Sequence, residues 1–264
     1  MTTDTVGSIF SMTKAITGAA AMQLVEQGKF DLDAPAGNVC PWLNEVQVLA
    51  GFDDDGQPIT RPPKSAVTLR NLLTHTSGFP YEIWNANDAR WREVTGTPSL
   101  FTLENAALRT PLAFDPGTRW EYGTGIDWTG KMVEQVSGMT LGEYFAANLT
   151  GPLDMTDTAF THSPSMLSRA AGLHTRMPDG SLVPMELPAP ENPEFEMGGG
   201  GLQATMRDYG KFIRMILNDG ELGGARVLRA DTVAMMGQNH IGALRVKELT
   251  TVAPQFSNNA EFFP

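Results

Sequence analysis

The stretch Ser11-Met12-Thr13-Lys14-Ala15-Ile16-Thr17 places a hydroxyl and an amine three residues apart. Residues at this spacing in a helix share one face, with Cβ atoms about 5–6 Å apart, so the Lys14 amine can reach the Ser11 hydroxyl. A serine at a helix N-terminus also lies beside free backbone N–H groups, which stabilise developing negative charge. The pair therefore predicts a serine nucleophile with a lysine base.

The same spacing also fits an ordinary helix, in which Ser11 is an N-cap and Lys14 is an exposed side chain. Lysine acts as a base only where desolvation or nearby positive charge favours its neutral form. The small residues at 18–21 allow close packing around such an amine. Evidence from elsewhere in the chain must decide between the two interpretations.

Composition limits the classes of protein that this chain can belong to. Its 264 residues, 41% of them hydrophobic, are enough for one large globular domain, or two closely packed ones, with a substantial core. A formal net charge of -11 and a sequence pI near 4.8 argue against nucleic acid or an anionic membrane as the main partner. No apolar run approaches the roughly 18 residues that a membrane-spanning helix needs.

No motif in the sequence calls for a metal or a cofactor. The single cysteine, Cys40, has no partner for an internal disulfide. None of the histidines stands in an H-E-x-x-H motif or beside a cysteine cluster; they are His75, His162, His174 and His240. The glycines at 198–201 lack the G-K-[ST] ending of a phosphate loop, and no serine stands in G-x-S-x-G.

Capping residues and turn signals predict mostly helices joined by irregular loops. We expect a helix from about Ser11 to Gln27, a hairpin around the D-G turn of 52–59, and a long surface loop over 176–197. The further helices that we expect are 69–73 capped by Thr68, 126–136 closed by Gly138, 141–148 capped by Thr140, and a helix from Thr205 through Leu217.

The combined pattern resembles the serine β-lactamase and penicillin-binding-protein superfamily, and within it the class C β-lactamase-related carboxylesterases called family VIII. The matching pieces follow the family's order and span positions 11 to about 220: the Ser11–Thr17 stretch, Gly28–Asp33, Leu72–Gly78, Pro116-Gly117 with Trp120 and Tyr122, Pro152–Met155 with Asp157-Thr158, and Gly198–Leu202 with the helix after it. The resemblance implies an α+β fold of the β-lactamase/transpeptidase type, with a helical part and an antiparallel sheet flanked by helices.

The resemblance also assigns roles to individual residues. It implies that Ser11 is the acylated nucleophile, that Lys14 takes its proton, and that Tyr122, the tyrosine of the family's Y-x-N motif, passes a proton to the leaving group. Thr124 replaces the motif's asparagine, which suits a simple ester better than a β-lactam side-chain amide. Thr124, Gly199 and Gly200 are the candidate substrate-binding residues. His75 falls in a segment that resembles a structural turn.

The family's third motif, on a late strand that helps to form the oxyanion hole, is not recognisable. Trp128-Thr129-Gly130 and His240-Ile241-Gly242 match its letters but fall in or beside helices. We therefore expect a fragment that lacks most of the sheet and exposes apolar surface. It would be one incomplete domain over 1–264. Its parts would be a nucleophile helix in 1–30, a mostly helical part with long loops in 31–197, and a glycine-rich loop, a helix and a truncated end in 198–264.

The leading functional hypothesis is a carboxylesterase that acylates Ser11 and acts on short or otherwise small esters. β-Lactamase and D,D-peptidase activity remain alternatives, because they share the acyl-enzyme mechanism. An inactive or ligand-binding fragment is a further alternative. The sequence leaves the oligomeric state and the compartment open; the cytoplasm is favoured, and the periplasm or secretion would follow from a signal peptide upstream of Met1.

Overall fold

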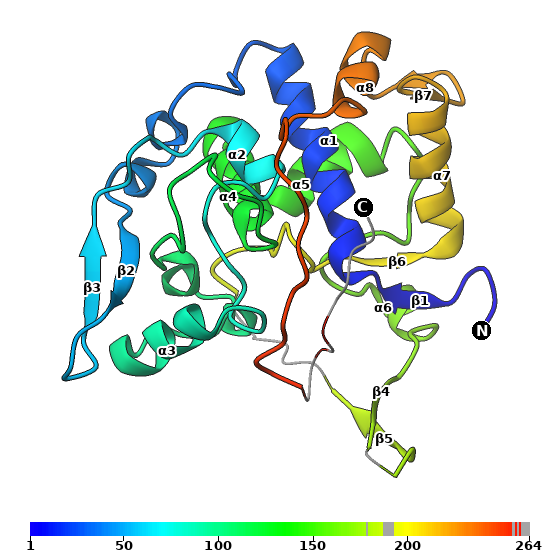
Figure 1. Ribbon diagram of the computed structural model, residues 1–264. Coiled ribbons are helices and arrows are strands. Elements are labelled where there is room, and N and C mark those ends of the chain that lie inside the picture. The colour runs from blue at the N-terminus through cyan, green and yellow to red at the C-terminus, as the bar shows by residue number, and fades with distance from the viewer. Residues whose placement is uncertain (178, 187–192, 255–256, 258, 260–264) are drawn as a thin grey trace.

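Helix α1 (Thr13–Glu26) runs through the middle of the molecule, and the other helices are arranged around it (Figure 1). The structure, a computed structural model, describes residues 1–177, 179–186, 193–254, 257 and 259. The remaining α-helices of these ranges are α2 (Leu69–Leu73), α3 (Ala86–Thr95), α4 (Gly125–Ser137), α5 (Leu141–Phe145), α6 (Pro164–Leu167), α7 (Met206–Leu217) and α8 (Ala230–Met236).

The strands of the described residues form separate antiparallel pairs instead of one continuous sheet. The pairs are β1 (Val6–Ser8) with β6 (Gln203–Thr205), β2 (Val48–Phe52) with β3 (Pro58–Arg61), β4 (Leu173–Arg176) with β5 (Leu182–Met185), and β7 (Glu221–Leu222) with β8 (Ala225–Arg226). The β1–β6 pair matters most for the site, because it sets the turn before α1 beside the glycine-rich segment before β6.

The core is built around α1. Ile16 and Leu24 are fully buried, and so is the alanine run 19–21 between them. Small side chains in this run let neighbouring helices approach closely, and α4 and α5 both pack against α1. Since α1 is buried around much of its circumference, its sequence carries no clear polar face.

The capping signals in the sequence are confirmed where they predict helix ends. Thr68 and Thr140 each form a capping box at the start of α2 and α5. Gly138 ends α4 in the left-handed conformation with φ of 71°. The Thr205 side chain accepts a hydrogen bond from the Asp208 N–H and so begins α7. The hairpin is also confirmed, as the pair β2–β3.

Three predicted boundaries differ from the structure. The helix expected from Ser11 begins as a 3₁₀ turn, Phe10–Met12, and becomes α-helical at Thr13. The helix expected over 141–148 continues from α5 into a π-helical turn, Ala146–Thr150, before Pro152. The prediction of a loop over all of 176–197 is wrong in part, because β5 pairs with β4 as an exposed hairpin. Its strands bury little surface and so lack a clear alternating pattern. Residues 187–192 lie outside the described residues.

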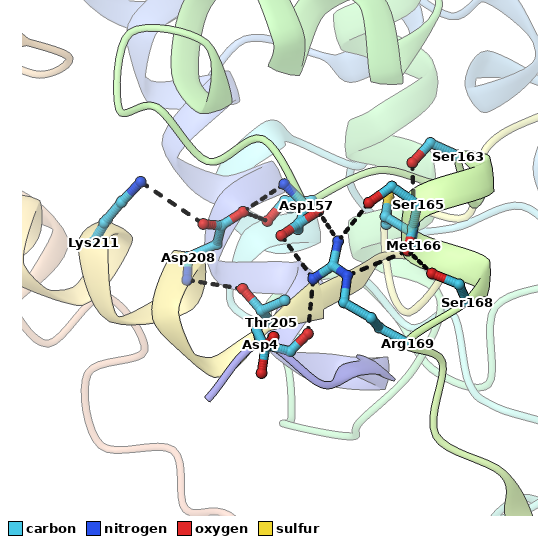
Figure 2. Close-up of polar contacts among 11 residues, drawn as sticks. Asp4, Asp157, Ser163, Ser165, Met166, Ser168, Arg169, Thr205, Asp208 and Lys211 are labelled. Carbon is cyan, nitrogen blue, oxygen red and sulfur yellow. Dashed lines mark hydrogen bonds and ion pairs between the residues drawn. The ribbon is translucent and has the colours of Figure 1, made fainter. Parts of the chain in front are cut away.

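A cluster of polar residues links the segment before β1, the segments on either side of α6 and helix α7 (Figure 2). Arg169 donates to both carboxylate oxygens of Asp157, at 3.0 and 2.5 Å, and to the Asp4 carbonyl at 2.7 Å. The buried Asp208 carboxylate accepts from the Asp157 N–H at 2.7 Å and from the Thr158 hydroxyl at 3.2 Å. We call these residues, with Lys211 beside Asp208, the Asp208 cluster.

Candidate active site

Ser11 lies in the exposed 3₁₀ turn that connects β1 to α1. Phe10, directly before it, has φ of 43°, a left-handed conformation that a bulky side chain adopts only at a cost. Strain of this kind persists where the surrounding structure holds it in place, and it is typical of functional sites. The turn is held by the Ile9 N–H, which donates to the Leu202 carbonyl, and by the β1–β6 pair.

The structure brings Ser11, Lys14 and Tyr122 together. The Lys14 amine, in the first turn of α1, donates to the Ser11 Oγ at 3.1 Å. The Tyr122 hydroxyl donates to the same Oγ at 2.6 Å from the loop before α4. Both groups are within proton-transfer distance of Ser11, which is the geometry that a serine nucleophile with a base and a second proton-transfer group requires.

Lys14 has two more hydrogen-bond acceptors, which the sequence analysis did not identify as partners. Its Nζ donates to the Tyr81 hydroxyl at 3.0 Å and to the Gly199 carbonyl at 2.6 Å. It also lies 4.7 Å from the ring centroid of Tyr122 and 5.2 Å from that of Tyr81. None of the ion pairs found among the described residues includes Lys14.

Asp127, in the first turn of α4, is a carboxylate that the sequence analysis missed. It is fully buried, accepts from the Gly199 N–H at 2.8 Å and lies 3.5 Å from the Tyr81 hydroxyl. Burial raises the pKa of Asp127, and the charge of Lys14 opposes that shift. Burial also raises the pKa of Tyr81 well above 10, so its hydroxyl stays protonated. In the sequence, Asp127 looks like an ordinary acidic residue in the first turn of a helix, so no local signal distinguishes it.

The His75 ring packs against the Tyr122 ring. The two ring centroids are 4.7 Å apart, and the His75 Nδ1 accepts from the Gly123 N–H at 3.4 Å. Burial, followed by the charge of Lys14, lowers the pKa of His75 to about 3, so the ring is neutral at ordinary pH. With φ of 57° and no contact to Ser11 among the described hydrogen bonds, His75 is placed as part of a structural turn.

The candidate substrate-binding residues lie close to this group but are already engaged or covered. Both the N–H and the carbonyl of Gly199 are hydrogen-bonded, to Asp127 and to Lys14. The Gly200 N–H donates to the Met197 carbonyl at 3.1 Å. Thr124 is only 2% exposed at the start of α4. Their role in binding substrate stays a prediction, and it would require these groups to change partners or to become exposed.

The two segments that match the letters of the third motif are placed away from strands. Trp128-Thr129-Gly130 is buried inside α4. The His240 ring bonds Arg70 at 2.6 Å through Nδ1 and the Met235 carbonyl at 2.8 Å through Nε2. Neither segment has a hydrogen bond to Ser11 among the described contacts, so no strand of the expected kind adjoins the nucleophile there.

A cavity of about 290 Å³ lies against Lys14 and His75. Its walls are largely apolar and include Gly18 and Met22 of α1 and Met236 of α8. Within the described residues, no group of three or more histidine, cysteine or acidic side chains could hold a metal ion. A separate search of the same residues finds no helix both long and apolar enough to cross a membrane.

Comparisons with known proteins agree with this geometry. A family model described as Beta-lactamase matches residues 1–249. The chain is 37% identical to a lovastatin esterase of Penicillium rubens over 90% of this chain and 61% of that protein. It is 35% identical to the acyltransferase mokF of Monascus pilosus over 94% of this chain and 60% of that protein.

A solved structure shows the same fold. A mutant of the simvastatin synthase LovD from Aspergillus terreus superposes with a TM-score of 0.81 at 34% identity, over 93% of this chain and 58% of that one. The expected β-lactamase/transpeptidase-like fold is therefore confirmed. The chain spans about 60% of the length of the curated relatives it matches.

Proposed function

Because this chain belongs to the Beta-lactamase family, we propose that it is a serine hydrolase that forms an acyl-enzyme on Ser11, with carboxylesterase activity on small esters. One observation carries the proposal: the Ser11 Oγ lies within hydrogen-bond reach of both the Lys14 amine and the Tyr122 hydroxyl. Groups at this distance can transfer a proton as the nucleophile attacks. The esterase among the relatives adds support.

In the acylation step, the neutral Lys14 amine takes the proton of the Ser11 hydroxyl while Oγ attacks the ester carbonyl. The C–O bond to the alcohol breaks, and the Tyr122 hydroxyl gives its proton to the leaving oxygen. The Lys14 ammonium, close to the Tyr122 ring, stabilises the resulting phenolate and returns a proton to it. Water then attacks the acyl-enzyme in the reverse sequence, and the acid leaves.

The apolar cavity beside Lys14 offers room for part of a small ester. Thr124 in place of the motif's asparagine favours an ester over a β-lactam. β-Lactamase and D,D-peptidase activity would use the same acyl-enzyme and rank below esterase activity on this ground. A ligand-binding role without turnover is the alternative that an unreactive Ser11 would favour.

Transfer of the acyl group to an alcohol is a second candidate function. It needs no further catalytic residue, because an alcohol replaces water as the group that attacks the acyl-enzyme. The match to the acyltransferase mokF favours it. The balance between hydrolysis and transfer depends on whether the site binds an alcohol better than it admits water.

Turnover of p-nitrophenyl butyrate and of nitrocefin by the whole protein, with methanol as an added acceptor, tests these candidates together. We expect faster release of p-nitrophenol than opening of nitrocefin, and no release with Ser11→Ala. Methyl butyrate would form in proportion to methanol if the site transfers acyl groups. Faster opening of nitrocefin would contradict the esterase assignment, and release of p-nitrophenol by Ser11→Ala at the wild-type rate would contradict the acyl-enzyme itself.

A further inference from the structure

The Gly199 peptide is fixed from two directions. Its N–H donates to the Asp127 Oδ1 at 2.8 Å, and its carbonyl accepts from the Lys14 Nζ at 2.6 Å. A Cβ atom at position 199 would lie 2.5 Å from the Asp127 Oδ2 and 2.8 Å from the Tyr81 hydroxyl. Such distances are too short for any side chain, so glycine lets the backbone approach the carboxylate and the lysine together.

Tyr81 forms a second link between the same two residues. Its hydroxyl accepts from the Lys14 Nζ at 3.0 Å and lies 3.5 Å from the Asp127 Oδ2. With its proton retained, the hydroxyl donates toward the carboxylate while its lone pair receives the amine. Two of the three oxygen acceptors of Lys14, the Gly199 carbonyl and the Tyr81 hydroxyl, therefore belong to groups that also contact Asp127.

We propose that Asp127 is the positioning residue of this site: it fixes the Gly199 peptide and the Tyr81 hydroxyl, and these hold the Lys14 amine against Ser11. The inference rests on the proposed acylation of Ser11 and assigns a role to a residue outside the S-x-x-K and Tyr122 motifs. Asp127 touches no reacting atom itself and acts through Gly199 and Tyr81.

An acidic residue in the first turn of a helix is ordinarily explained by the helix dipole or by a capping bond. Asp127 differs, because its side chain reaches across to a segment more than seventy residues away and is fully buried. A buried carboxylate without partners would be costly, and its partners here are the peptide and the hydroxyl that hold the lysine. Its place in the helix therefore does not account for the contacts that it makes.

The charge of Asp127 also acts on Lys14. The other titratable groups that face this pair are Tyr81, Tyr122 and the neutral His75, so Asp127 is the acidic side chain among them. Burial raises the pKa of Asp127, and the charge of Lys14 opposes that shift, so the two charges interact. A carboxylate favours the ammonium form of a nearby lysine, whereas a neutral amide does not. Asp127→Asn keeps an oxygen acceptor for the Gly199 N–H and removes the charge.

The rate of Ser11 labelling by a fluorophosphonate, measured against pH, tests the proposal on the whole protein. With Asp127→Asn, the pH profile of the labelling rate is expected to move to lower pH, since a carboxylate that favours a nearby cation is removed. The maximal rate is expected to fall about tenfold, since the amine is held less firmly. A purely structural role would not move the pH profile. Asp231→Asn, in the first turn of α8, is the matched control and should leave both quantities unchanged.

Tyr81→Phe keeps the proposal falsifiable if Asp127→Asn does not fold. Loss of this hydroxyl should lower the maximal labelling rate about tenfold at an unchanged melting temperature. Wild-type rates and an unshifted profile in the folded variants, with Ser11 labelled in the wild type, would overturn the role of Asp127 alone. A wild-type protein that is not labelled at Ser11 would overturn the proposed function and this inference together.

Discussion

The molecule contains two polar groups near the β1–β6 pair, and their charges are arranged in opposite ways. In the Asp208 cluster, each cation meets a carboxylate: Arg169 pairs with Asp157 at 2.5 Å, and Lys211 lies 3.8 Å from the Asp208 carboxylate (Figure 2). In the candidate active site, the Lys14 amine meets hydroxyl and carbonyl oxygens. Its carboxylate, Asp127, lies beyond the Tyr81 hydroxyl.

This difference distinguishes a group of residues that stabilises the fold from a group that can take part in a reaction. A lysine in direct contact with a carboxylate is kept as an ammonium ion and cannot act as a base. A lysine surrounded by neutral oxygen atoms can give up one proton, donate its two remaining N–H groups to two of them and accept a hydrogen bond from a hydroxyl with its lone pair. The same residue types therefore tie the segment before β1 to α7 in one place and, in the proposed mechanism, activate a serine in the other.

The largest effect is expected from Lys14→Met, which removes the amine and keeps much of the side-chain volume. Without the base, the rate of Ser11 acylation should fall by about 10³-fold, measured as the p-nitrophenol burst from p-nitrophenyl butyrate. Lys211→Met makes the same change in the Asp208 cluster and should retain activity within about twofold. Equal losses in the two variants would show that the distinction between the two groups is wrong.

A smaller effect, on stability instead of rate, is expected from Asp208→Ala. The change leaves the part-buried Asp157 N–H and the buried Thr158 hydroxyl without their acceptor, which should cost about 2–4 kcal/mol of the free energy of unfolding. Urea denaturation measures this loss. Acylation well below the melting temperature should stay near the wild-type rate. A variant of unchanged stability would argue against a structural role for the cluster.

The smallest effect is expected on the stability of the folded protein at low pH. The pKa of His75 in the folded protein, about 3, is below its ordinary value of 6.5, so the unfolded chain binds this proton more readily. The stabilisation that neutral His75 provides is therefore lost as pH falls from about 6.5 toward 3. Burial raises the pKa of Asp208, so its protonation in the same direction carries no such cost.

Hydrogen exchange at pH 7 and pH 4.5 distinguishes the two regions. After correction for the intrinsic pH dependence, protection should fall more around 75–80 than in α7 (Met206–Leu217). His75→Asn keeps a residue that tolerates positive φ and removes the titrating ring, so it should lessen this difference. A uniform loss of protection, the same in both proteins, would argue against His75 as the cause.

Features that depend on local sequence could be predicted. The S-x-x-K spacing placed Lys14 on the same helix face as Ser11, and the threonine caps at 68 and 140 placed two helix starts correctly. Helix caps and side-chain pairs within one helical turn depend on residues only a few positions apart, so they can be predicted from the sequence. Tyr122 could be associated with the pair only through the resemblance to a family.

Features that depend on contacts between distant segments could not be predicted from single residues. Tyr81 follows a proline in the loop between α2 and α3, and Asp127 looks like an ordinary acidic residue of a first turn. Packing of α4 against α1 brings Asp127 into the site, and the path of the loop brings the Tyr81 hydroxyl to Lys14. The β4–β5 hairpin was missed because its exposed strands lack a buried face.

Peptide mapping by mass spectrometry after exposure of the whole protein to a fluorophosphonate tests the central claim most directly. The account predicts one adduct, on the peptide that contains Ser11, formed in the wild-type protein and at least about 100-fold more slowly in Lys14→Met. An adduct on a different residue, or one formed on Ser11 at the same rate without the Lys14 amine, would contradict it.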